Sequence, residues 1–124
     1  MSKIGFIGGT GPEGKGLGLR MAMAGHEVIL GSRNIDRAKT AAEDIKKLVN
    51  EKLLIKGESN SYAASESDIV FITVPYDGHK NTLIDLESEL NGKTVVDTVV
   101  PIRVIKGNFE SMPVTFNLES LEVV

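Results

Sequence analysis

The sequence KIGFIGGTGPEG, from Lys3 to Gly14, decides the fold of this chain. Its first five residues predict a short buried strand, and residues 15–24 predict a helix. Gly9, Gly11 and Gly14 therefore lie on a G-x-G-x-x-G frame at a strand-to-helix turn. In that context the frame is a fingerprint of dinucleotide binding.

Each glycine of the frame has its own expected task. Gly9 permits the tight turn, Gly11 lets a pyrophosphate approach the backbone, and Gly14 lets the helix pack closely on the strand. Gly14 and Gly18 share a helix face that is expected to lie on the sheet. The helix N-terminus offers free N–H groups and a partial positive charge to the phosphates. An ordinary glycine-rich turn is the competing interpretation, which the flanking strand and helix disfavour.

The end of the second predicted strand indicates which nucleotide is bound. In NAD-specific domains an Asp or Glu about 20 residues beyond the glycines accepts hydrogen bonds from the ribose. This chain has Ser32 and Arg33 there, with Arg37 one helical turn further. A hydroxyl and guanidinium groups suit a 2′-phosphate, so the pattern favours NADP over NAD. A solvated basic helix start is the alternative, although cations there oppose the helix dipole.

The rest of the chain alternates between predicted strands and helices, so we expect an α/β fold with a doubly wound parallel sheet of the Rossmann type. Its expected strand order is 3-2-1-4-5, with right-handed crossovers. After the first strand, strands are expected over 27–30, 53–56, 69–74 and 94–99, with 113–118 as a candidate extra strand. Helices are expected over 35–49, from a cap at Asn60 or Ser61 to Ala64, and over 79–90.

This order places the cleft between the first and fourth strands, at their carboxyl ends. Residues 74–79 and 97–98 meet the glycine loop there, so the nicotinamide end of a cofactor is expected beside them. Tyr76 is either a stacking platform or a cover for the core, and His79 either touches a ligand or begins a helix. Asp97 is either a hydrogen-bonded structural carboxylate or a catalytic one, and the structural role is favoured.

Length and composition limit the class of protein. The 124 residues predict one domain, and the apolar fraction of 41% is typical of a soluble globular chain. No apolar run approaches the ~20 residues of a membrane helix, and no signal peptide is visible, so a cytoplasmic location is expected. The chain has no cysteine and no metal-ligand spacing. A net charge of −3 with scattered basic residues argues against nucleic acid as a partner.

Several motifs together carry a resemblance to a known family. They are GGTGPEGKG over 8–16, AGHEV over 24–28 and GSR over 31–33, followed by VPY over 74–76 and by His79. They resemble the N-terminal half of the NADP reductases that use the deazaflavin coenzyme F-420 (F420). In that family hydride moves between the reduced deazaflavin and NADP.

The resemblance implies NADP as the cofactor and the deazaflavin as its hydride partner. Together with the glycine frame, it gives an expected cofactor-binding set: Gly9, Thr10, Gly11, Pro12, Glu13 and Gly14 at the phosphates and ribose, Ser32, Arg33 and Arg37 at the 2′-phosphate, and Val74, Pro75, Tyr76 and His79 near the nicotinamide and the deazaflavin. Hydride transfer depends mainly on placing two rings in contact, so no catalytic side chain is assigned.

Members of that family continue into a helical second domain that completes the deazaflavin pocket and a homodimer. Residues 1–124 are therefore expected to form a single NADP-binding Rossmann domain without the helical one. Two other functions stay open: a non-catalytic NADP-binding regulatory module, and a related reductase with a flavin or a small carbonyl or imine acceptor. The glycine loop cannot separate these three, because cofactor binding is common to all.

Overall fold

The predicted alternation of strands and helices is present in the computed structural model, which describes residues 2–100, 102–105 and 107–111. The strands of its main sheet are β1 (Lys3–Ile7), β2 (Glu27–Ser32), β3 (Ile55–Ser59), β4 (Ile69–Ile72) and β5 (Thr94–Asp97). The helices are α1 (Pro12–Met23), α2 (Ile35–Leu48), α3 (Asn60–Glu66), α4 (Tyr76–Asp85) and α5 (Glu87–Leu90). An antiparallel hairpin follows, formed by β6 (Ile102–Ile105) and β7 (Asn108–Ser111).

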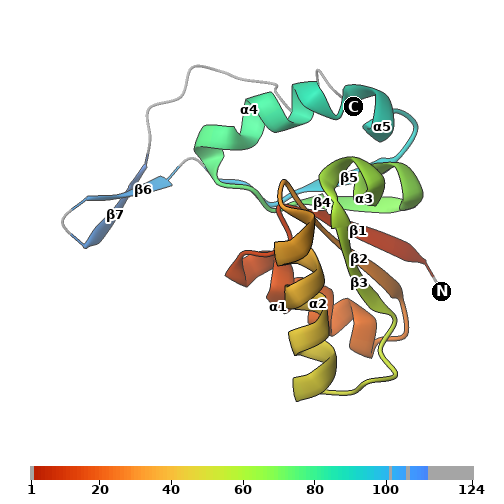
Figure 1. Ribbon diagram of the computed structural model, residues 1–124. Helices are drawn as coiled ribbons and strands as arrows, with labels where there is room; N and C mark the ends of the chain where they lie inside the picture. The colour runs from red at the N-terminus through yellow and green to blue at the C-terminus, as the bar shows by residue number, and fades with distance from the viewer. Residues whose placement is uncertain (1, 101, 106, 112–124) are drawn as a thin grey trace.

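The main sheet has the order β3-β2-β1-β4-β5, and every neighbouring pair is parallel. This confirms the predicted doubly wound topology. Figure 1 shows α1 and α2 on one face of the sheet and α3, α4 and α5 on the other, with the hairpin of β6 and β7 projecting to one side. The switch point between β1 and β4 thus lies in the middle of the sheet, where a cleft is expected at the carboxyl ends of the strands.

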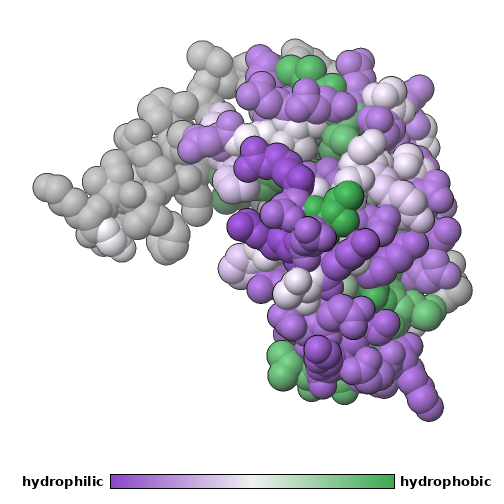
Figure 2. All heavy atoms as spheres, viewed as in Figure 1, coloured by the Kyte–Doolittle hydropathy of each residue, from purple (hydrophilic) through white to green (hydrophobic). Residues whose placement is uncertain are grey.

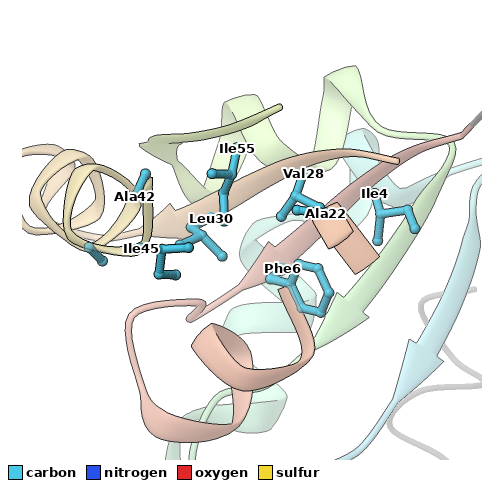
Figure 3. Packing of buried hydrophobic residues seen from close by; sticks show 9 residues of the cluster. Ile4, Phe6, Ala22, Val28, Leu30, Ala42, Ile45 and Ile55 are labelled. Carbon is cyan, nitrogen blue, oxygen red and sulfur yellow. The ribbon is translucent and has the colours of Figure 1, made fainter. Parts of the chain in front are cut away.

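Alternate strand residues supply two separate cores, because successive side chains of a strand point to opposite faces. On the face of α1 and α2 the buried residues include Ile4, Phe6, Val28, Leu30, Ala42 and Ile45, which Figure 3 shows converging between the strands and the two helices. On the other face they include Ile7, Ile29, Val70, Ile72, Leu83 and Leu90. A sheet covered on both faces explains why its central strands are almost wholly apolar.

Helix α1 lies unusually close to the sheet. Its buried residues are Gly14, Gly18 and Ala22, which share one face, as the spacing of the two glycines predicts. A Cβ atom at Gly18 would lie 2.9 Å from Leu30 Cδ2. The helix also begins at Pro12, three residues before the predicted start, because proline is well suited to the first helical position.

The third strand runs over Ile55–Ser59 and not over the predicted residues 53–56. Gly57, expected in a loop, lies in this strand against α2: a Cβ atom there would be 2.0 Å from the carbonyl carbon of Ala38. Helix α3 follows at once, and its cap is Ser59, whose Oγ accepts a hydrogen bond from Tyr62 N at 3.1 Å. The predicted caps Asn60 and Ser61 are thus wrong. The side chain of Asn60 instead accepts a hydrogen bond from Gly8 N.

The second half departs further from expectation. The helix predicted over 79–90 begins at Tyr76 and is divided into α4 and α5. β4 and β5 are both shorter than predicted. The hairpin of β6 and β7 was not predicted, and the candidate strand over 113–118 lies outside the described residues.

One face of the molecule is mostly polar (Figure 2). Figure 2 shows a largely hydrophilic face with small, separated apolar groups. Within the described residues, no helix combines the length and apolarity needed to cross a membrane.

Candidate functional site

A cleft of about 1160 Å³ opens at the carboxyl ends of the strands. The glycine loop, the end of β2, the start of α3 and the segments after β4 and β5 all contribute to its wall. Such a volume slightly exceeds the usual range for small-molecule pockets, so it suits an extended ligand. Ten residues of the expected cofactor-binding set line it: Thr10, Gly11, Pro12, Glu13, Ser32, Arg33, Arg37, Val74, Pro75 and Tyr76.

The glycine loop is shaped by backbone contacts. Gly8, and not Gly9, has the left-handed backbone (φ +72°) at the turn. Gly9 N donates a hydrogen bond to Gly31 O at 2.8 Å, and a Cβ at Gly9 would lie 2.9 Å from Phe6 O. A Cβ at Gly14 would lie 2.6 Å from Gly9 Cα. Gly9 and Gly14 therefore hold the loop against the sheet and do not line the cleft.

Gly11 has a different environment from these two glycines. Within the described residues, and apart from its chain neighbours, a Cβ atom there would have a single neighbour within 4 Å, Gly8 O at 3.9 Å. Gly11 is also the N-cap of α1, and it lies on the cleft wall. The first N–H groups of a helix lack intrahelical partners and attract anions. Free space beside a helix N-terminus is what a pyrophosphate needs, so the residues present fit that group.

Asn60 is a site residue that the sequence analysis missed. Its Oδ1 accepts a hydrogen bond from Gly8 N at 3.1 Å, so the first residue of α3 holds the glycine loop. A Cβ at Gly31 would lie 2.7 Å from the same Oδ1 atom, which explains why a glycine stands at that point of β2. An Asn near a helix start is typical of a cap, and no local pattern distinguishes the two uses.

The end of β2 offers a hydroxyl and two cations to the cleft. Ser32 is 7% exposed, and its Oγ accepts a hydrogen bond from Asn34 N at 3.0 Å, which leaves the hydroxyl proton for another acceptor. Asn34 Oδ1 caps α2 by accepting from Arg37 N. Arg33 and Arg37 are exposed, and neither guanidinium forms a salt bridge with any residue in the described part of the chain. No carboxylate of this strand end lines the cleft.

The opposite wall is formed after β4 and β5. Val74, Pro75 and Tyr76 follow β4, while Thr98 follows β5. Thr98 Oγ donates to Ile72 O at 2.7 Å and also contacts the carboxylate of Glu13 at the start of α1. The segments that the topology was predicted to bring together therefore do meet.

His79 lies behind this wall. It is 6% exposed, it does not line the cleft, and its Nε2 atom lies 2.7 Å from Asp97 Oδ2. Its ring stacks with that of Tyr76, with the centroids 6.4 Å apart. Asp97 is hydrogen-bonded, as expected of a structural carboxylate, while Tyr76 faces both the cleft and His79.

A parallel sheet in this order, with a glycine-rich loop at its switch point, defines a Rossmann-type fold. The chain belongs to the family described as NADP oxidoreductase, coenzyme F420-dependent, whose sequence profile matches residues 3–101. This confirms the resemblance on which the expected site was based.

Relatives support the same family. The chain is 41% identical over 101 residues to the F420-dependent NADP reductase of Methanothermobacter marburgensis, a match that covers 81% of this chain and 45% of the relative. It is 38% identical over 109 residues to the enzyme of that name from Methanocaldococcus jannaschii, covering 86% and 48%. The chain thus spans about half the length of these relatives.

A solved structure shows the same fold. The crystal structure of a candidate F420-dependent NADP reductase from Arthrobacter sp. FB24 superposes with a TM-score of 0.77 at 22% identity. The superposition covers 99% of this chain and 56% of that chain.

Proposed function

We propose that residues 1–124 form a single NADP(H)-binding Rossmann domain of an oxidoreductase that transfers hydride between the deazaflavin F420 and NADP. The observation that carries the proposal is the end of β2, where Ser32, Arg33 and Arg37 line the cleft and no carboxylate does. Membership of the F420-dependent family supports both cofactors.

The proposed binding mode assigns the adenosine end to the β2 side of the cleft. Arg33 can bind a 2′-phosphate with its forked N–H groups, Arg37 adds charge, and the Ser32 hydroxyl donates. The pyrophosphate would lie beside Gly11 at the N-terminus of α1, with Thr10, Pro12 and Glu13 around it.

The nicotinamide would then extend toward Val74, Pro75 and Tyr76, where the deazaflavin ring would also lie. The bound cofactors supply the hydride donor and acceptor. The task of this chain is to hold one ring in place and keep water from it, and such placement contributes several kcal/mol, up to roughly 7–11 in favourable cases. The chain spans about half the length of its relatives, so we propose the rest of the deazaflavin pocket and the homodimer for the whole protein. A cytoplasmic location is a further proposal.

Calorimetric titration of the chain with NADP+ and NAD+ tests the nucleotide assignment. Hydrogen bonds to charged groups contribute roughly 1.5–3 kcal/mol, so NADP+ is expected to bind about tenfold to a hundredfold more tightly. Arg33→Ala should remove most of this preference. Arg20→Ala, at an exposed arginine of α1 outside the cleft wall, is the matched control. Equal affinity of the unmutated chain for both nucleotides would refute the assignment.

Absorbance of the reduced deazaflavin, mixed with NADP+ and this chain, tests the hydride partner. We expect slow turnover by the chain alone and fast turnover once a helical second domain is supplied, because lost positioning can cost about 100-fold. Fast turnover by the chain alone would refute the need for that domain. Activity only with a flavin or an imine would favour the related-reductase alternative, and NADP+ binding without turnover in any combination would favour the regulatory module.

A further inference from the structure

We infer that the His79–Asp97 pair is a positioning device for the nicotinamide end of the cleft, an inference that rests on the proposed function. In this view neither residue touches the cofactor. Both act through the wall residues that they hold, so His79 belongs behind the expected cofactor-binding set and not in it.

The pair joins two elements across a short, partly buried contact. The Nε2–Oδ2 distance is 2.7 Å, and the His79 and Asp97 side chains are 7% and 24% exposed. His79 belongs to the first turn of α4, and Asp97 is the last residue of β5. A hydrogen bond with an ionised partner is typically about twice as strong as a neutral one, so this contact ties the start of α4 to the end of the sheet.

Each member of the pair holds one residue of the cleft wall. The His79 ring stacks with Tyr76 at an interplanar angle of 12°. Asp97 Oδ1 accepts a hydrogen bond from Val99 N at 3.0 Å. Tyr76 and Val99 line the cleft, whereas His79 and Asp97 do not. The pair therefore links the two wall residues and fixes their separation.

Of the two wall segments, the start of α4 is the one that needs this tie. The segment after β5 is already anchored, because both the amide and the hydroxyl of Thr98 bond to Ile72 O. The N-cap of α4 is Pro75, which makes no side-chain capping bond. Without His79, the first turn of α4 would lose this bond to β5, and Tyr76 would lose the ring that stacks with it. A wall ordered in advance lowers the entropy cost of holding a ring.

The test compares two ligands of the 124-residue chain: NADP+, and adenosine 2′,5′-bisphosphate, which has the 2′-phosphate but no nicotinamide. Loss of a hydrogen bond to a charged group predicts that His79→Leu and Asp97→Leu each weaken NADP+ binding about tenfold. Binding of the bisphosphate should stay unchanged. The double variant should lose less affinity than the two single losses added together, because both changes break the same contact.

Two further variants separate positioning from general packing. His79→Gln places an amide where Nε2 stands and should restore most of the NADP+ affinity. Lys80→Ala changes the exposed neighbour on α4 and should alter neither ligand. Circular dichroism checks that each variant folds, and His79→Asn replaces His79→Leu if that variant does not fold.

The outcomes distinguish this inference from the proposed function. Equal weakening of both ligands, or of neither, by His79→Leu overturns the positioning role. So does an unmutated chain that binds both ligands equally, because its nicotinamide end then contributes nothing. If the unmutated chain binds neither ligand, the proposed function fails and the inference falls with it.

Discussion

The two halves of the sheet are held together in different ways. Around β1, β2 and β3 the backbone makes the closest contacts: Gly9 lies against β1 and β2, and Gly57 against α2, while the Asn60 side chain adds a bond to Gly8 N. Around β4 and β5 side chains make them, through the Thr98 hydroxyl and the His79–Asp97 pair. Close backbone approach requires glycine, which can be recognised in a sequence. A hydrogen bond between side chains far apart in the sequence cannot be recognised in this way.

Gly57→Ala should destabilise the chain more than any other substitution proposed for it, and it tests the first half. The added Cβ would lie 2.0 Å from the Ala38 carbonyl carbon, a backbone atom that cannot move without shifting α2. We expect a loss of about 3 kcal/mol or more in the free energy of unfolding. Urea denaturation followed by circular dichroism measures it.

Gly78→Ala is the matched change in the second half. Among the described residues, and apart from the nearby backbone of its own helix, its new Cβ would meet nothing closer than Thr82 Oγ at 4.0 Å, and Gly78 lies inside α4. Alanine favours a helix by about 1 kcal/mol over glycine, so this variant should be as stable as the unmutated chain or more so. A similar loss of unfolding free energy in both variants would show that the two halves do not differ in how closely their backbones pack.

Gly11→Val should abolish nucleotide binding and leave the fold intact. Gly11 has φ −77° and ψ 169°, a conformation that valine adopts readily, and its Cβ would enter open space. That space is the proposed seat of the pyrophosphate, so we expect NADP+ affinity to fall by about 100-fold or more, equivalent to about 2.7 kcal/mol. Calorimetry measures the affinity and thermal unfolding the stability. Normal binding by a folded variant would mean that the loop does not hold the phosphates.

The contrast between the halves also explains how far the sequence could predict the molecule. The sheet order, β1, and the meeting of the glycine loop with residues 74–79 and 97–98 follow from strand periodicity and glycine spacing. Gly57 was expected in a loop, because the residue that leaves no room for a side chain there, Ala38, lies in a different element. Local patterns cannot reveal a contact between two such segments.

The site shows the same division. Ten of the thirteen expected binding residues line the cleft, since local motifs mark them. Asn60 was missed because its partner, Gly8, is 52 residues away, and its position fits a helix cap equally well. His79 and Asp97 are 18 residues apart in the sequence. The sequence could therefore place both near the cleft, but it could not show that they bond to each other.

Ser67→Ala should have a small effect, and it extends the comparison to single hydroxyl groups. Ser67 is fully buried, and its Oγ has no hydrogen-bond partner in the described part of the chain. It lies against β1, where a Cβ at Gly5 would come within 2.5 Å of it. Burying a polar group without a partner costs free energy, so its removal should leave stability unchanged or raise it by up to about 1 kcal/mol.

Thr73→Val is the matched change at a bonded hydroxyl. Thr73 Oγ donates to Ile7 O at 2.7 Å, so its loss should cost about 1 kcal/mol. Urea denaturation of both variants gives the two values under one condition. If Ser67→Ala is as destabilising as Thr73→Val, then the Ser67 hydroxyl contributes a bond of its own in solution. In that case a second side-chain hydrogen bond, besides that of Thr73 to Ile7 O, would hold β1 in place.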